Sequence, residues 1–173
     1  MLERSQTDHG AAGDYQLWVI YIDAREEARR HGGRRVGTEH LVLALLGESA
    51  LANALGSDLD EARTALEVID DDALAAAGLD ARFDVAPLLE RELARAPRRP
   101  TLKAVLQGRL PLTPAAKSAL RGSSGEMRRD GRHPGPRCVL GELLRLQWPG
   151  PAAELFSRLG VDADVAAERL TDA

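Results

Sequence analysis

The sequence has few aromatic residues: they make up 3% of its 173 residues, against 44% for hydrophobic residues as a whole. A chain with so little Phe, Tyr and Trp must build its core from Leu, Ala and Val, which favours packed helices over a β-sheet. The chain is long enough to bury about 70% of the surface that its unfolded form exposes. We therefore expect an all-α protein of one domain, or of two small units that share a core.

Cysteine is nearly absent as well. Cys138 is the only one in the sequence, which excludes an intrachain disulfide and a zinc site built from cysteines. The four histidines (His9, His31, His40 and His133) have no ligand-like spacing, so we expect no metal and no cofactor. We also expect no enzyme, because Cys138 precedes an apolar run and should be buried and inert. His133 lies near Cys138 in the sequence, in a segment rich in Gly and Pro, and we do not expect it to act as a catalytic base for that thiol.

Long apolar runs are missing too. No stretch approaches the roughly 18 residues of a membrane span, and no signal-like segment opens the chain, so we expect a cytoplasmic protein without a membrane partner. The net charge of −4 is unevenly spread, since residues 97–137 hold ten Arg or Lys against Glu126 and Asp130. Such a segment attracts nucleic acid, but this one has no aromatic residue to stack on bases. We interpret it as a solvated linker.

Apolar residues recur with the period of a helix in several segments. Residues 41–46 (LVLALL) are apolar on all sides and predict a short, central, buried helix. Residues 50–55 and 57–69 predict two further helices, the second capped by Ser57 or Asp58. An earlier helix should begin at Asp14 as N-cap and end near His31, with one face formed by Leu17, Ile20, Tyr21, Ala24 and Ala28. Residues 1–13 have no apolar period and should be disordered.

The most informative feature is an internal repeat. Residues 54–66 (ALGSDLDEARTAL) recur as residues 158–170 (RLGVDADVAAERL), with six identities at a constant offset of 104. Residues 40–46 pair with residues 138–144 at an offset of 98. The second copy therefore carries six extra residues between its second and third helices, close to residues 145–150 (RLQWPG).

These repeats divide the chain. Residues 14–71 form the first repeat, and residues 112–173 form a second, divergent one. The first helix of the second repeat should have Thr113 as N-cap and Pro114 at its first position. Between the repeats, we expect residues 72–111 to be a helical bridge that includes a basic, proline-rich linker.

Three motifs resemble a known family. EEAxxxGxxxVGTEHLxLALL, ALGxDLDxAR and LTPxAK are similar to the Clp repeat domain, the N-terminal module of Clp/Hsp100 unfoldases, and most like its ClpC type. The resemblance covers about residues 14–70 and 112–171. It implies an all-α pseudo-dimer of two four-helix units that docks adaptors, captures substrates and has no catalytic activity. The sequence lacks the GxxxxGK[ST] loop of the family's ATPase, so it resembles such an N-domain without its motor.

The resemblance also implies a ligand site in the first repeat. In ClpC-type N-domains, the Thr-Glu pair of each copy is associated with phosphoarginine, a degradation mark. Here the residues are Gly37, Thr38 and Glu39: the helix N-terminus and the threonine would take the phosphate, and the carboxylate the guanidinium. The alternative is that Thr38 and Glu39 only cap the helix, with His40 packed against the neighbouring unit.

The second repeat does not repeat this pattern. Where the family has Gly-Thr-Glu-His, the chain has Gly135, Pro136, Arg137 and Cys138. Pro136 lacks an N–H donor, and Arg137 would repel a guanidinium. We therefore expect one ligand site rather than two.

Two tryptophans are candidates for an interface with a partner. Trp148 lies in the extra residues of the second repeat, where it either anchors a partner or covers the core. Trp18 lies between Leu17 and Val19 on the first helix and faces either the core or a partner.

The main functional prediction is a binding module for substrates or adaptors of a Clp unfoldase or protease, acting in protein quality control. A second hypothesis is a protein that sequesters cyclic peptides or toxins directed at the unfoldase's N-domain. A regulatory nucleic-acid module that uses residues 97–137 is the least favoured, and a steep salt dependence of DNA binding would be its signature.

Overall fold

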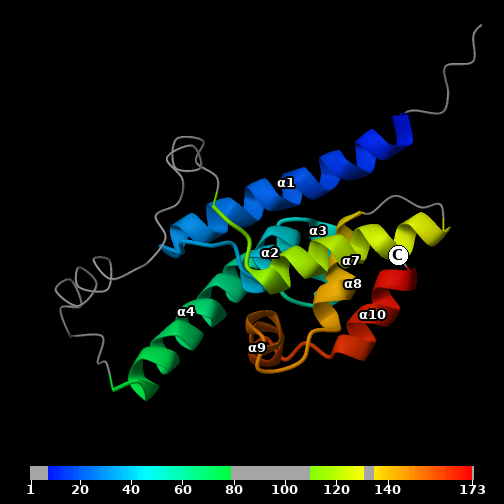
Figure 1. Ribbon diagram of the computed structural model, residues 1–173. Helices are drawn as coiled ribbons and strands as arrows, with labels where there is room; N and C mark the ends of the chain where they lie inside the picture. Colours follow the sequence, from blue (N-terminus) through cyan, green and yellow to red (C-terminus); the bar gives the residue numbers. More distant parts are fainter. Residues whose placement is uncertain (1–7, 79–109, 131–134, 173) are drawn as a thin grey trace, which may run out of the picture.

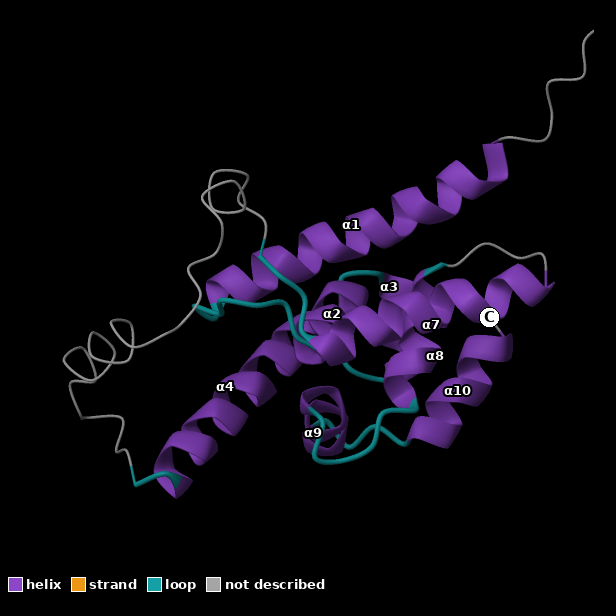
Figure 2. Ribbon diagram, in the orientation of Figure 1, coloured by secondary structure: helices purple, strands orange, loops and turns teal. Residues whose placement is uncertain are grey.

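The computed structural model describes residues 8–78, 110–130 and 135–172, which form helices joined by loops (Figure 1 and Figure 2). The helices of these ranges are α1 (Asp8–Arg30), α2 (Thr38–Leu46), α3 (Ser49–Leu55), α4 (Leu59–Ala76), α7 (Pro114–Asp130), α8 (Pro136–Leu144), α9 (Pro151–Arg158) and α10 (Ala163–Asp172). The predicted all-α fold is confirmed. None of these helices is both long and apolar enough to cross a membrane.

The helices pack as two reciprocal sets, α1–α4 and α7–α10. Helix α3 contacts α10 while α9 contacts α4, and α1 contacts α8 while α2 contacts α7. Each of these pairs joins a helix of one set to a helix of the other, and α2 contacts α8 directly. The two sets therefore share one core, as an all-α pair of repeats requires.

Helix α2 lies at the centre of this core, in contact with α1, α3, α4, α7, α8 and α9. Leu41, Val42 and Leu43 have no exposed surface, which confirms the central burial predicted for residues 41–46. Leu140 and Leu143 of α8 are equally buried. Burying such side chains contributes roughly 1.5–3 kcal/mol each before entropy is deducted, so these two helices dominate the hydrophobic stabilisation.

Helix α1 is longer than predicted. It begins at Asp8, so Asp14 lies inside the helix instead of capping it, and residues 8–13 are helical rather than disordered. Residues 1–7 lie outside the described residues. A helix nucleated by packed residues extends at low cost, because each added residue gains one hydrogen bond. The packed face is the predicted one: Ile20, Ala24 and Ala28 are buried, and Leu17 and Tyr21 are partly buried against them.

Helix α4 also runs past its predicted end. Asp58 is its N-cap, with Oδ1 accepting a hydrogen bond from the Glu61 N–H at 2.8 Å, as one of the two predicted caps. The helix continues to Ala76 across the expected repeat boundary at residue 71. All residues from 70 to 78 are exposed, and Figure 1 shows this end of α4 projecting away from the other helices. The rest of the expected bridge, residues 79–109, lies outside the described residues.

A buried ion pair that the sequence pattern did not indicate joins α1 to α4. Arg63 Nη2 donates to Glu27 Oε1 at 2.6 Å, and Arg63 Nε donates to Glu27 Oε2 at 3.0 Å. The Glu27 side chain is only 9% exposed. The hydrogen bonds from Arg63, with the guanidinium charge, outweigh burial and hold the pKa of Glu27 below its ordinary value. This bidentate contact fixes the two helices relative to one another.

The second repeat begins as predicted. Thr113 Oγ1 accepts a hydrogen bond from the Ala116 N–H at 3.2 Å, and Pro114 is the first residue of α7. The extra length of this repeat includes the connection after α8, where residues 145–150 replace the two residues that join α2 to α3.

Candidate functional site

The end of α1 and a backbone bridge to the segment before α7 hold the start of α2 in place. Gly32 has a φ of 69°, in the left-handed region, and ends α1 with little steric cost. The Val36 N–H then donates to the Pro111 carbonyl at 2.9 Å, and the Thr113 N–H donates to the Val36 carbonyl at 2.8 Å. This single parallel bridge ties the segment before α2 to the segment before α7.

Gly37 and Glu39 are in direct contact at the helix start. Gly37 is the N-cap of α2, and the Glu39 carboxylate lies so close to its Cα that a Cβ at residue 37 would overlap the carboxylate oxygens. Glycine at this position leaves room for the Glu39 carboxylate, and its backbone angle is an ordinary extended one. The carboxylate lies in the first turn of α2, where the helix dipole favours an anion.

Thr38 does not cap its own helix, contrary to the sequence-based prediction. It is the first residue of α2 and is 1% exposed, and its Oγ1 accepts a hydrogen bond from the Ala152 N–H at 3.3 Å. Gly37 precedes it as the N-cap, and an N-cap is the position from which a side chain reaches the free N–H groups of the first turn. The Thr38 hydroxyl instead caps α9 and joins the two repeats.

His40 is buried and makes two contacts through the same nitrogen. Nδ1 accepts a hydrogen bond from the Gly37 N–H at 3.0 Å and also lies 2.9 Å from Glu39 Oε1. An imidazole nitrogen accepts when it is unprotonated and donates when it carries a proton. The hydrogen bond from the Gly37 N–H therefore requires Nδ1 without a proton, whereas a hydrogen bond to Glu39 Oε1 requires Nδ1 with a proton.

Glu39 is a shielded carboxylate with spare hydrogen-bonding capacity. Its side chain is 16% exposed, and no described residue makes a hydrogen bond to its buried Oε2. Burial works to raise the pKa of Glu39, but the hydrogen bond and charge of His40 outweigh it and the pKa is lowered. An ionised carboxylate with one free oxygen attracts a guanidinium or ammonium donor.

The start of α8 has a different chemistry, in keeping with the predicted divergence of the second repeat. Gly135 is again the N-cap, but Pro136 occupies the first helical position and Arg137 is exposed. Cys138 is only partly buried, so the predicted burial of this thiol is wrong. Arg137 and Cys138 lie in the first turn of α8, and the buried residues of this helix begin at Val139.

The two candidate interface tryptophans are both exposed. Trp18 is 45% exposed on α1, with its ring 5.3 Å from that of Tyr21. Trp148 is 74% exposed, so it does not cover the core.

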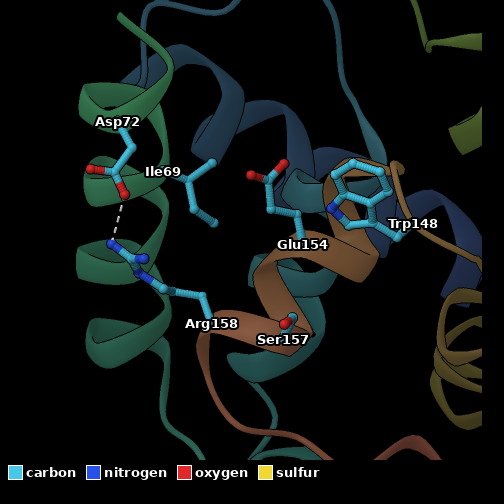
Figure 3. Close-up of a pocket in the computed structure, with 6 residues that line it drawn as sticks. All are labelled: Ile69, Asp72, Trp148, Glu154, Ser157 and Arg158. Atoms are coloured by element: carbon cyan, nitrogen blue, oxygen red, sulfur yellow. Dashed lines mark hydrogen bonds and ion pairs between the residues drawn. The ribbon is translucent and has the colours of Figure 1, made fainter. Parts of the chain in front are cut away.

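Trp148 borders a pocket of about 370 Å³ between α4, α9 and the loop before α9. Figure 3 shows its lining: Ile69, Asp72, Trp148, Glu154, Ser157 and Arg158. The sequence drew attention to Trp148 alone, because the other lining residues come together only when α4 of the first repeat packs on α9 of the second. Neither Trp18 nor residues 37–39 line this pocket.

The described residues contain no group of three or more His, Cys, Asp or Glu side chains placed to hold a metal ion. His133, considered earlier as a partner for Cys138, lies outside the described residues.

This architecture is also found among solved protein structures. No family model and no curated protein sequence matches the chain. Among solved structures, the crystal structure of the N-terminal domain of the caseinolytic protease associated chaperone ClpD from Arabidopsis thaliana is similar over 91% of this chain and 93% of its own. The TM-score is 0.59 and the sequence identity is 18%, so the similarity concerns the fold. The chain therefore has the fold of a Clp N-terminal domain, as its repeat motifs predict.

Proposed function

We propose that this chain is a non-catalytic module that binds proteins or peptides in Clp-dependent protein quality control. The observation that carries the proposal is the match, over nine-tenths of the chain, to the N-terminal domain of a chaperone associated with a caseinolytic protease. The sequence motifs add support, because those around residues 26–46 are the ones typical of ClpC-type N-domains. The partners would be substrates or adaptors of a Clp unfoldase.

We further propose that the start of α2 recognises a modified arginine, of which phosphoarginine is the favoured form. Glu39 supports this reading, since its ionised carboxylate has one oxygen without a partner among the described residues. A guanidinium that displaces the groups covering that buried oxygen would satisfy it, and the free N–H groups of the first turn would face the phosphate. The Thr38 hydroxyl already accepts a hydrogen bond from Ala152, so the backbone is assigned the larger part in holding the phosphate.

One ligand per chain is expected, because the second repeat offers no carboxylate at the corresponding place. Arg137 stands where Glu39 stands in the first repeat, and its exposed guanidinium would repel that of the ligand. Pro136 removes one N–H from the first turn of α8.

Titration calorimetry with free phosphoarginine tests this site. We expect saturable binding near one equivalent for the wild type and a loss on the order of 10-fold or more in Glu39→Ala, which removes a charge-assisted contact. The matched control is Glu48→Ala, which removes an exposed carboxylate next to α3 and should bind like the wild type. Glu39→Ala should still fold, because no buried apolar packing is lost, at a cost of roughly 0.3–1 kcal/mol for the lost interaction of the carboxylate with the helix dipole.

Gly37→Ala provides a second test that leaves Glu39 in place. The added Cβ would overlap the Glu39 carboxylate, and the flexible side chain would have to rotate away from its position at the helix start. We expect a folded protein with weakened phosphoarginine binding. If the wild type gives no saturable heat, Glu39 serves only the helix and His40, and the module binds through another surface. Equal binding by the wild type and both variants would remove the start of α2 from the site.

Exposed aromatic surface on α1 favours a second candidate, the sequestration of cyclic peptides. Trp18 and its neighbour Val19 are both exposed, on a helix whose other face packs on α2. A cyclic peptide directed at ClpC-type N-domains should then change the emission of Trp18 in a Trp148→Phe protein. An unchanged emission spectrum at saturating peptide would count against this role.

A further inference from the structure

The pocket beside Trp148 lies at the junction of the two repeats and is separate from residues 37–39. Ile69 and Asp72 enter it from α4, whereas Glu154, Ser157 and Arg158 enter from α9 (Figure 3). Trp148 presents most of its indole surface to solvent at the edge of the pocket. An exposed tryptophan beside a concave surface is the kind of residue that anchors partners.

The charges around this pocket are predominantly negative. Arg158 Nη2 contacts Asp72 Oδ2 at 2.9 Å, so that the two lining charges of opposite sign largely neutralise one another. Glu154 has no ion-pair partner among the described residues and remains as an exposed negative charge. Three further carboxylates are exposed on the same end of α4 and strengthen the negative electrostatic potential there: Glu67, Asp70 and Asp71. An anionic ligand would be repelled here, and a cationic one attracted.

We infer that this pocket binds an arginine side chain of a basic peptide segment on a partner protein. The guanidinium would stack on the indole of Trp148 and pair with the Glu154 carboxylate, while its aliphatic stem contacts Ile69. Arginine fits better than lysine because its planar, weakly hydrated head both stacks on an aromatic ring and forms two parallel hydrogen bonds to a carboxylate. The surface thus goes beyond the proposed recognition of a modified arginine, since it uses other residues and needs no phosphate.

The probe is a fluorescein-labelled peptide, Gly-Leu-Arg-Ser-Arg-Leu-Gly, followed by fluorescence anisotropy. We expect saturable binding to the wild type, weakened about 5-fold by Trp148→Ala and on the order of 10-fold by Glu154→Gln. The same peptide with citrulline in place of arginine keeps the shape but lacks the charge, and should not bind measurably.

Matched variants separate this site from a general attraction of positive charge. Asp164 lies in the first turn of α10 as Glu154 lies in the first turn of α9, so Asp164→Asn removes an equivalent exposed charge away from the pocket. Trp18→Ala removes the other exposed indole. Both control proteins should bind the peptide as the wild type does.

Several outcomes would overturn the inference. Equal affinity for the arginine and citrulline peptides would mean that the charge is not recognised. Equal losses in Glu154→Gln and Asp164→Asn would mean that only net charge matters. Self-association that Trp148→Ala abolishes, seen by sedimentation without peptide, would make a second copy the occupant. Failure of phosphoarginine to bind leaves this inference standing, because Glu39 takes no part in it.

Discussion

The starts of α2 and α8 are the same structure with different chemistry. Both helices follow a glycine N-cap, and both bury several apolar side chains in the shared core. Their first turns differ, since Thr-Glu-His in α2 corresponds to Pro-Arg-Cys in α8. Both starts thus keep a glycine and buried apolar residues, while their polar residues differ. In α2, Thr38 and His40 have internal partners, whereas Glu39 has one oxygen without a partner among the described residues, so folding explains it least.

Leu43 and Gly141, its counterpart at the offset of 98 residues, should differ most in whether the protein still folds with a charge there. Leu43 has no exposed surface, and Leu43→Asp should prevent folding because an unpaired buried charge costs several kcal/mol. At Gly141 there is open space where a Cβ would lie, so Gly141→Asp should fold. Circular dichroism of the two purified variants measures this difference. A helical, cooperatively melting Leu43→Asp protein would mean that α2 is not the centre of the core.

The next effect concerns the Glu27–Arg63 ion pair of the first repeat. At the offset of 104 residues, Arg63 corresponds to Ala167, so the second repeat has no guanidinium at this place. Glu27→Gln should lower the unfolding free energy at neutral pH by about 1–2 kcal/mol, less than for a fully buried pair because Arg63 is 26% exposed. Urea titration provides the measurement. An unchanged midpoint would show that the pair adds no net stability.

The stability that Glu27→Gln loses relative to the wild type should depend on pH. Since Arg63 lowers the pKa of Glu27 in the folded protein, its stabilisation is fully present above the ordinary value of 4.5 and is lost as the pH falls through the lower folded pKa. The difference in unfolding free energy between the wild type and Glu27→Gln should therefore narrow as the pH falls from about 5 through the lowered pKa of Glu27. A difference that stays constant over this interval would mean that Glu27 does not titrate with folding.

The smallest effect is a gain in stability within the second repeat. Gly141 lies inside α8, and glycine in a helix interior costs about 0.5–1 kcal/mol relative to alanine. Because the added Cβ meets no atom within 4 Å, Gly141→Ala should raise the unfolding free energy by that amount. Thermal unfolding followed by calorimetry would detect it. A loss of stability would indicate that the space beside Gly141 closes in solution.

Local signals predicted most of this fold from the sequence. The apolar pattern predicted the central position of residues 41–46, the cap residues at Asp58 and Thr113 are correct, and the repeat offset of 98 residues aligns α8 with α2. The sequence did not predict contacts between distant residues. Thr38 and Ala152 are 114 positions apart, and only the packed repeats bring them together.

The candidate site was predicted less completely for the same reason. Sequence motifs selected Gly37 and Glu39, but not the burial of Glu39, which results from the turn of its carboxylate over a residue without a Cβ. The pocket at Trp148 depends on the continuation of α4 to Asp72, beyond the end at residue 69 that the apolar pattern predicted. Helix propagation and packing between repeats decide both features, and neither leaves a pattern in a local window of sequence.

The projection of α4 gives one helix two kinds of stability. Amide hydrogens near Ala62 and Leu66, whose side chains are buried, should exchange with solvent only when the core opens. Amides beyond Asp72 belong to an exposed end and should exchange through local fraying at little cost in free energy. A partner that contacts only the outer half of α4 would thus be recorded as slower exchange in that half, with the inner half unchanged.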